Sequence, residues 1–246
     1  VGIGKTIEAG LIVRELLDRG EIGRAAFLCP PHLVEQWQSE LKVRFNISAL
    51  ALTANNVARI ERSLPAGISL FEQYPFVVVS LDYIKTEKHR EHFLNIAPEC
   101  IVVDEAHTCA SASGSGRQLR FELLQRLVDD KSLSRHLIML TATPHSGKDA
   151  AFYNLLSLLD RDFMQLATAA PDSRTDLRNR LAACFVQRRR KDIEEWQDTS
   201  MFPRRMTTEL SYQLTGPWGE FFNRVYDYCI DLANSMEQAD QKAGSM

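Results

Sequence analysis

The amino-acid sequence predicts an α/β protein of three layers, in which a parallel sheet lies between two layers of helices. Two observations lead to this fold class. Residues 1–160 alternate short apolar runs with longer amphipathic segments. The runs are about five residues long, and three of them are rich in Val and Ile, which is typical of strands buried on both faces of a parallel sheet. Because parallel neighbours are joined by right-handed crossovers, helices are expected on the faces of the sheet.

The apolar runs predict five strands, at Ala25–Cys29, 47–52, Phe76–Ser80, 100–104 and 136–140. The segments before and between them have the apolar spacing of helices, near 5–19, 32–44, 55–63, 82–95 and 117–128. Small polar residues fill 108–116, which predicts a flexible loop.

After Pro144 no strand pattern follows, and helices are predicted at 148–160, 174–186 and 217–238. We therefore expect two parts, a lobe at 1–160 and a helical extension at 161–246. Apolar residues of the last helix recur every three or four positions and form one stripe. They are Trp218, Phe222, Val225, Cys229, Leu232 and Met236. We expect this stripe to pack on neighbouring helices or on another lobe.

Composition narrows the classes of function. The chain has 246 residues, of which 45% are hydrophobic, and a net charge of −3. This balance excludes a disordered tail or a fibre, and no apolar run approaches the roughly 20 residues that cross a membrane. Bulk charge does not indicate a nucleic-acid module, although 174–191 holds seven basic residues against one acid. Five cysteines without a C-x-x-C pair predict reduced thiols in a cytoplasmic protein.

The first segment, VGIGKTIEAG at 1–10, contains the second half of the phosphate-binding pattern G-x-x-x-x-G-K-[ST]. Backbone N–H groups of such a loop, followed by a helix N-terminus, suit phosphate oxygens. Lys5 is placed to reach the β- and γ-phosphates, and the Thr6 hydroxyl to hold Mg²⁺. We expect the start of the loop and the strand before it to precede Val1.

Two further motifs follow predicted strands. In IVVDEAH, Asp104 and Glu105 come at the carboxyl end of a strand, where α/β sheets bind ligands. One carboxylate there can orient hydrated Mg²⁺, and the next can orient or deprotonate an attacking water. In LTATPHSG, Thr141 and Thr143 follow another strand, and their hydroxyls are expected to hydrogen-bond the acidic motif.

Five motifs follow one another along the chain in the order GKT, PPHLVEQW, SLDYI, DEAH and TATP. This order resembles the first motor lobe of superfamily 2 helicase-like ATPases. Within it, the residues PPHL, QW and SLDY resemble the Swi2/Snf2 branch. GKTIEAGLI and TATPHSGK resemble its bacterial members. The later FVQRRRKDI, FPRR and FFNRVYDY resemble the Snf2-related ATPase of DISARM-type phage-defence systems. The resemblance implies a RecA-like P-loop NTPase lobe, ATP and Mg²⁺ as cofactors, and double-stranded DNA as partner. Other subunits of a defence system are a further expected partner, and a membrane is not.

The resemblance also implies roles for the matching residues. Nucleotide is held by Gly2, Gly4, Lys5 and Thr6. Mg²⁺ is held by Thr6 and, through water, by Asp104, while Glu105 positions the attacking water.

Coupling of hydrolysis to movement is assigned by the resemblance to His107, Thr141 and Thr143. The expected contacts to the DNA backbone are Pro30, Pro31, His32 and Ser80, with Arg188 as a further candidate. Two alternatives stay open here: His32 is a structural residue, and the basic run 188–191 is a solvated helical face.

The resemblance further implies a second motor lobe in the same polypeptide, which carries arginine fingers and is needed for ATP hydrolysis. Two alternatives to a DNA translocase stay open at this point. One is a helicase that separates strands of DNA or RNA with the same ATP site. The other is a nucleotide switch or assembly subunit that does not hydrolyse ATP, against which the intact Lys5, Thr6, Asp104 and Glu105 argue.

Overall fold

The computed structural model describes residues 4–65, 67–84, 86–110, 115–130, 135–144, 149–188 and 208–243. The chain divides into two compact units, Val1–Arg188 and Arg189–Met246. Gly2 and residues 189–191 of the basic run, both singled out from the sequence, lie outside the described residues.

The first unit is built on a parallel sheet of five strands in the order β2-β3-β1-β4-β5. The strands are β1 (Ala25–Cys29), β2 (Leu50–Leu52), β3 (Phe76–Ser80), β4 (Cys100–Val103) and β5 (His136–Met139). The predicted parallel sheet is confirmed, and four strands lie within one residue of their predicted bounds. β2 begins three residues later than the apolar run at 47–52, because backbone groups of residues 47 and 49 are hydrogen-bonded to helix α2 (Val34–Phe45) and not to a strand. The Ile47 N–H donates to the Leu41 carbonyl, and the Gln38 amide donates to the Ala49 carbonyl.

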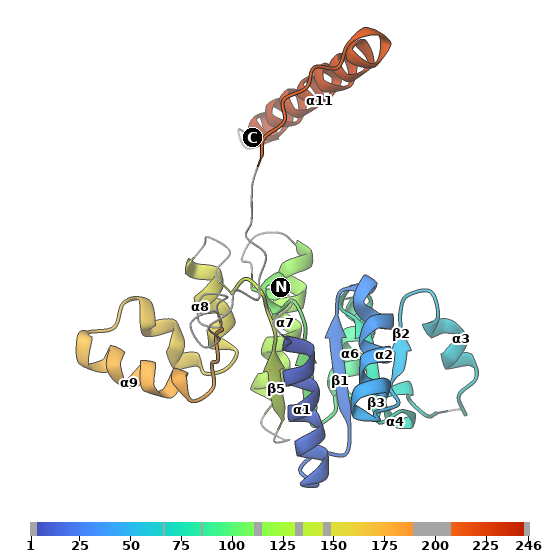
Figure 1. The fold of residues 1–246 in the computed structure, drawn as a ribbon, viewed down its shortest axis with the longest axis vertical. Helices are drawn as coiled ribbons and strands as arrows, with labels where there is room; N and C mark the ends of the chain where they lie inside the picture. The colour runs from blue at the N-terminus through green and yellow to red at the C-terminus, as the bar shows by residue number, and fades with distance from the viewer. Residues whose placement is uncertain are drawn as a thin grey trace. The chain divides into compact units, whose positions relative to one another are not determined.

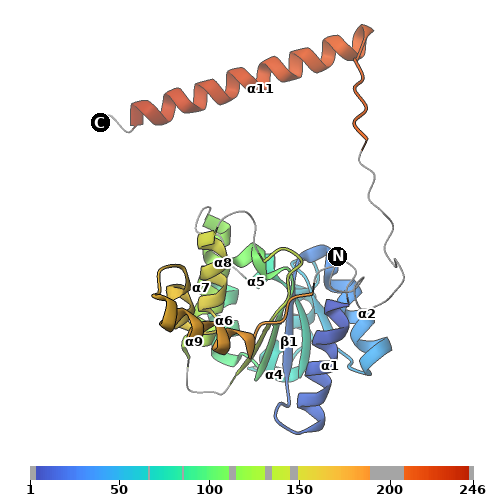
Figure 2. The same cartoon turned by 60° about the vertical axis from the view of Figure 1, so that its left-hand side comes forward.

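Alternate strand residues belong to two separate cores, which makes the unit three-layered as predicted (Figures 1 and 2). Phe27 and Val102 pack with α1 (Lys5–Asp18) and α2 on one face. Leu28 and Val103 pack on the other face with α6 (Glu87–Ile96) and α7 (Ser115–Asp129). Each central strand is therefore buried on both sides, and this explains its unbroken apolar sequence.

Several predicted segments differ from the structure in detail. The single helix expected at 82–95 is divided into α5 (Leu81–Ile84) and α6, because Thr86 is extended and its hydroxyl donates to the Tyr83 carbonyl. A short helix that the sequence did not predict, α4 (Leu70–Gln73), is started by a capping box between Ser69 and Glu72. The remaining helix of this region is α3 (Val57–Arg62).

The loop prediction at 108–116 is wrong at both ends. Thr108 and Cys109 belong to the 3-10 turn η2 (Ala106–Cys109), and Ser115 begins α7. Residues 111–114 lie outside the described residues. Cys109 is buried in the core beneath α7, so the first part of this small polar stretch serves packing.

A smaller core follows the sheet. It is formed by α8 (Asp149–Ser157), the 3-10 segment η3 (Arg161–Ala167) and α9 (Pro171–Ala182), and it contains Phe152, Leu156, Phe163, Leu166 and Leu177. The absence of a strand pattern after Pro144 correctly predicted this helical region. The compact unit to which it belongs continues to Arg188.

The second unit is described only from residue 208 and contains α11 (Gly216–Ala243), which confirms the predicted helical C-terminal part. Among residues 208–243, the described part of this unit, the expected packing of the apolar stripe is not found. Trp218 is 73% exposed, and Phe222, Val225 and Leu232 are exposed as well. The Phe222 ring stacks on that of Tyr226, its neighbour one turn along. None of the helices that the structure describes is both long and apolar enough to cross a membrane.

An ion pair joins the amino ends of two neighbouring strands. Glu99, just before β4, accepts hydrogen bonds from the Arg24 backbone N–H at 2.8 Å and from the Arg24 guanidinium at 2.9 and 3.1 Å. Burial alone raises the pKa of Glu99, but donation from Arg24 outweighs it and leaves this pKa below its ordinary value. The ion pair therefore stabilises the alignment of β1 with β4. This alignment also fixes the positions of the residues that follow the carboxyl ends of the two strands.

Replacement of Glu99 by Gln is expected to lower the free energy of unfolding at pH 7 by about 1–2 kcal/mol, because charge-assisted hydrogen bonds are lost. Folding lowers the pKa of Glu99, so its contribution is present above the unfolded value of about 4.3 and is lost as pH falls through the folded value. Urea unfolding at pH 7 and at successively lower pH measures both effects. The control is Glu15→Gln, which breaks an exposed pair with Arg19 and should change little. A Glu99→Gln deficit that persists unchanged in acid would contradict the assignment.

Candidate functional site

The motif residues gather at one edge of the sheet because all five strands are parallel. The segments that leave the carboxyl ends of β1, β3, β4 and β5 begin at Pro30, Leu81, Asp104 and Leu140. Helix α1 runs back along the sheet, so that its first residue, Lys5, lies at the same edge as Glu105. The sheet therefore brings together three motifs that lie far apart in the sequence.

Gly4 starts α1 in a conformation that favours glycine. Its φ is 89° and its ψ is 18°, in the left-handed region. Gly4 has no side chain that could cap the helix, so within the described residues the N–H groups of its first turn are left without a side-chain acceptor. A helix N-terminus without a cap, beside the ammonium of Lys5, is suited to an anion such as phosphate.

Asp104 is 7% exposed, and both of its carboxylate oxygens accept hydrogen bonds. The indole N–H of Trp37 donates to Oδ2 at 2.9 Å, and the backbone N–H of Glu105 donates to Oδ1 at 2.8 Å. Burial, and then the nearby Asp104 carboxylate, raise the pKa of the Cys29 thiol to about 12, which keeps that thiol neutral. Sequence reasoning included Trp37 in a motif but gave it no role. Its contact joins residues 67 positions apart, which no local pattern reveals.

Glu105 has a φ of 50°, which is unusual for a residue other than glycine. This conformation turns the chain sharply after Asp104 and directs the Glu105 carboxylate toward α1. Its Oε1 lies 3.8 Å from Lys5 Nζ, and its Oε2 lies 3.2 Å from His107 Nδ1. A strained residue at the end of a central strand, between a cation and a histidine, is characteristic of a functional site.

His107 connects the acidic motif to the next strand. Its Nδ1 lies 3.0 Å from Thr141 Oγ1, and the same hydroxyl accepts a hydrogen bond from the Thr143 backbone N–H at 3.1 Å. The expected hydrogen bond between the Thr141 hydroxyl and the acidic motif is therefore present. Thr143 takes part through its backbone N–H, and its role in coupling stays a prediction.

The oxygen donors at this edge fit Mg²⁺. They are the Asp104 carboxylate, which forms no ion pair with any residue that the structure describes, and the Thr6 hydroxyl in the first turn of α1. Mg²⁺ usually takes one or two protein oxygens and completes its shell with water and substrate phosphates. Among the described residues no group of three or more His, Cys, Asp or Glu side chains forms a metal cluster. The edge thus suits a metal that arrives with phosphate better than a fully protein-bound ion.

The residues predicted to contact nucleic acid lie at the same edge but differ in exposure. Pro31 and His32 are exposed in the 3-10 turn η1 (Pro31–Leu33), directly after β1, and Pro30 is half-buried. Ser80 is only 3% exposed, and its hydroxyl accepts a hydrogen bond from the Asp82 N–H. The structure therefore brings this group together at one edge, with η1 as its accessible part.

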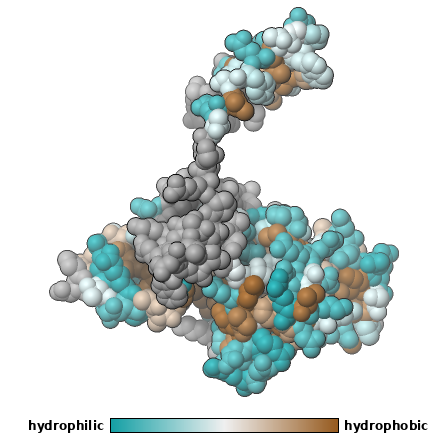
Figure 3. Space-filling model, in the orientation of Figure 1, coloured by the Kyte–Doolittle hydropathy of each residue, from teal (hydrophilic) through white to brown (hydrophobic). Residues whose placement is uncertain are grey.

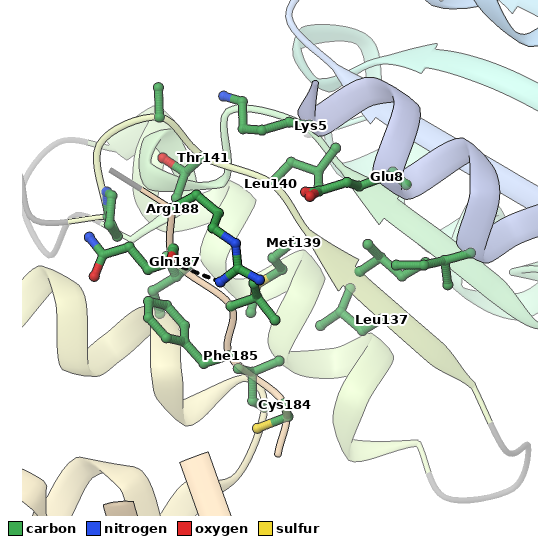
Figure 4. Close-up of a pocket in the computed structure, with 18 of the residues that line it drawn as sticks. Lys5, Glu8, Leu137, Met139, Leu140, Thr141, Cys184, Phe185, Gln187 and Arg188 are labelled. Atoms are coloured by element: carbon green, nitrogen blue, oxygen red, sulfur yellow. Dashed lines mark hydrogen bonds between the residues drawn. The ribbon is translucent and has the colours of Figure 1, made fainter. Parts of the chain in front are cut away.

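A cavity of about 620 Å³ lies beside the site, between α1, β5, α8 and residues 184–188. Lys5 and Thr141 lie at one end of it, and Leu137 and Cys184 lie at the other (Figure 4). Arg188 also lines this cavity, and its guanidinium donates a hydrogen bond to the Gln187 carbonyl. The apolar side chains of Leu11 and Ile12 line the cavity and are exposed, and apolar surface is visible over this region in Figure 3.

Comparison with known proteins agrees with this description. Residues 1–195 match the SNF2-related domain family. The uncharacterized ATP-dependent helicase YqhH of Bacillus subtilis (strain 168) is 34% identical over 159 residues, which cover 65% of this chain and 25% of YqhH. The RNA polymerase-associated protein RapA of Yersinia enterocolitica is 32% identical over 164 residues, 66% of this chain and 16% of RapA. The chain thus spans a quarter or less of the length of these curated relatives.

Among solved structures, the SWI2/SNF2 ATPase core of Sulfolobus solfataricus in complex with dsDNA matches with a TM-score of 0.50 and 19% identity, over 65% of this chain and 30% of that one. The fold is thus RecA-like, three-layered and built on a parallel sheet, as the sequence predicted. The chain belongs to the SNF2-related domain family.

Replacement of Gly4 by Ala is expected to destabilise the protein by about 1–2 kcal/mol, because an L-residue is strained at positive φ. A Cβ at this position would meet no atom within 4 Å, so the effect isolates backbone strain from collision. The control is Gly23→Ala, where space is equally open and φ is not positive. Equal unfolding midpoints for the two variants in urea would show that the loop does not hold the left-handed conformation.

Proposed function

We propose that the chain is the ATP-binding lobe of a motor that hydrolyses ATP to move along double-stranded DNA. The observation that carries the ATP part is the cluster of Gly4, Lys5, Asp104 and Glu105, with an uncapped helix N-terminus beside it. An uncapped N-terminus and an ammonium suit phosphate, and a buried carboxylate with no cationic partner in the described part suits the accompanying Mg²⁺. The name of YqhH, an ATP-dependent helicase, supports the same chemistry.

In this proposal each residue has a distinct task. The first turn of α1 and Lys5 bind the phosphates, and Thr6 and Asp104 hold Mg²⁺, which supplies charge stabilisation to phosphoryl transfer when bound. Glu105 orients the attacking water and accepts its proton. In the structure Glu105 lies near Lys5 at 3.8 Å. We infer that γ-phosphate competes for the Lys5 ammonium, which leaves the Glu105 carboxylate available for water.

The carboxylates can be tested separately. Glu105→Gln is expected to keep Mg²⁺-dependent ATP binding and to lower turnover by about 10²–10⁴-fold, because only the group that positions and deprotonates water is removed. Lys5→Ala should instead weaken ATP binding, because a charge-assisted phosphate contact is lost. Phosphate release and binding of a fluorescent ATP analogue measure the two effects in a polypeptide that contains both motor lobes. Glu35→Gln, on an exposed position of α2, is the matched control. ATP hydrolysis by Glu105→Gln at the parent rate would refute its role.

We infer that the partner is double-stranded DNA. The structural neighbour from Sulfolobus solfataricus was solved with dsDNA, and this supports the inference for the present chain. Contacts to phosphates must come from local groups, since the net charge is −3. The exposed turn at Pro31 and His32, beside the ATP site, is the first candidate, and Arg188 is the second. Ser80 is buried, so we expect a contact at that point to come from neighbouring backbone.

Movement along an intact duplex is distinguished from strand separation by two assays on a polypeptide with both lobes. A translocase is expected to displace the third strand of a DNA triplex in the presence of ATP and to leave a plain forked duplex paired. Its DNA affinity should fall steeply with salt and vary little with sequence, because phosphate contacts dominate. Unwinding of the fork without triplex displacement would favour the strand-separating helicase, and neither activity despite ATP binding would favour the nucleotide switch. The Glu105→Gln variant serves as the inactive control in both assays.

Two further parts of the proposal concern the setting of this lobe. We expect a second lobe in the same polypeptide to supply the arginine fingers, which contribute about 10³–10⁵ in rate to this chemistry, so ATPase activity of the first lobe alone should be slight.

We also propose a role in phage defence, with partner subunits of a defence system. This rests on the resemblance of FVQRRRKDI, FPRR and FFNRVYDY to the DISARM-type ATPase.

A further inference from the structure

We propose that Trp37 is a positioning residue for the metal site, where its indole N–H fixes the orientation of the Asp104 carboxylate. The inference rests on the proposed function, because it concerns the carboxylate to which we assign Mg²⁺. Binding of nucleotide does not by itself require a contact between this carboxylate and α2, yet the structure has one. A tryptophan on a helix packed against the sheet donates its single side-chain N–H to the buried acid at the end of β4.

The burial of both partners makes this contact energetically important. Trp37 is 2% exposed and Asp104 is 7% exposed, so neither can exchange the hydrogen bond for one to water without movement. A buried carboxylate is costly unless it is paired or hydrogen-bonded. No Lys or Arg within the described ranges forms an ion pair with Asp104. Two N–H donors, from Trp37 and from the Glu105 backbone, therefore hold the negative charge in place while leaving it uncompensated.

The two donors also determine the direction of the carboxylate. One approaches Oδ2 from α2 and the other approaches Oδ1 from the turn after Asp104. With both in place the plane of the carboxylate is fixed, and each oxygen retains lone-pair capacity for a further ligand. Loss of a partner that orients a metal-binding group in this way typically lowers metal affinity by about 10–100-fold.

Trp37 is itself held rigidly. Its ring lies 5.4 Å from that of Phe27 on β1, centroid to centroid, within the core formed by α1, α2 and the sheet. This packing raises the alternative that Trp37 is an ordinary core residue whose N–H merely found an acceptor. The alternative predicts that loss of the N–H affects stability alone, whereas the proposal predicts a selective loss of the Mg²⁺ effect on nucleotide binding.

The test compares the affinity for a fluorescent ADP analogue with Mg²⁺ and with EDTA in the protein and in Trp37→Phe. The measured quantity is the dissociation constant in EDTA divided by that with Mg²⁺. This Mg²⁺ ratio is expected to fall about 10-fold in Trp37→Phe, the lower end of the range for partners that orient metal ligands. The affinity in EDTA should change less than about twofold, because the phosphate contacts of α1 remain. The double variant with Asp104→Asn should be no worse than Asp104→Asn alone, since Trp37 acts through that carboxylate.

Two controls separate packing from positioning. Phe27→Leu removes ring contact with Trp37 but keeps the indole N–H, so it should lower the melting temperature and keep the Mg²⁺ ratio. Trp218→Phe makes the same chemical change at an exposed position of α11 and should change neither. A Trp37→Phe protein with a normal Mg²⁺ ratio would overturn the role of Trp37 and leave the ATP site intact. If the unaltered protein has no Mg²⁺-dependent nucleotide binding, the proposed function fails, and the role of Trp37 fails with it.

A second measurement keeps the proposal testable if Trp37→Phe does not fold. In ¹⁵N-labelled protein with nucleotide bound, addition of Mg²⁺ should shift the indole N–H resonance of Trp37 and leave that of Trp218 unmoved. Trp218→Phe and Asp104→Asn identify the two signals, the first by loss of a peak and the second by a shift. An indole resonance of Trp37 that is indifferent to Mg²⁺ would overturn the proposal.

Discussion

The hydrogen bonds to the buried carboxylate of Asp104 are the interactions on which the arrangement of the site depends. The Asp104 N–H donates to the Leu28 carbonyl, which extends the pairing of β4 with β1 by one residue. Its side chain is then held by Trp37 from α2 and by the Glu105 N–H. The backbone and the side chain of one residue thus join two strands, a helix and the turn that carries Glu105. Because a buried acid is costly without its donors, these hydrogen bonds favour one arrangement of the surrounding elements.

The left-handed turn at Glu105 follows from the same constraint. The Ala106 N–H donates to the Leu140 carbonyl, and the Leu140 N–H donates to the Val103 carbonyl, so the chain on both sides of Glu105 is tied to the end of β5. Between these fixed points the chain has to turn sharply, and the positive φ of Glu105 makes the turn. The turn brings His107 within 3.2 Å of the Glu105 carboxylate and 3.0 Å of the Thr141 hydroxyl. The strained turn at Glu105 therefore places the acidic motif in contact with the segment after β5, through His107 and Thr141.

Much of the fold was predictable, because strands buried on both faces have continuous apolar sequences. The runs at Ala25–Cys29 and Phe76–Ser80 matched observed strands without change. The site was predictable only as far as its residues follow strands or start a helix, as Lys5 and Asp104 do. The contact of Trp37 with Asp104 depends on how α2 packs, and the break at Thr86 depends on one side-chain hydrogen bond. Periodicity carries no information on either contact, nor on the exposure of the apolar stripe on α11 within the described residues.

Helix α2 connects the exposed turn η1 with the buried carboxylate of Asp104. Its first residue, Val34, directly follows the turn η1, which carries the exposed Pro31 and His32. Trp37 lies three residues later, about 4.5 Å along the helix axis, and donates to Asp104. Because η1 continues directly into α2, the exposed residues that we propose contact nucleic acid and the indole N–H that holds Asp104 belong to one continuous segment of the chain.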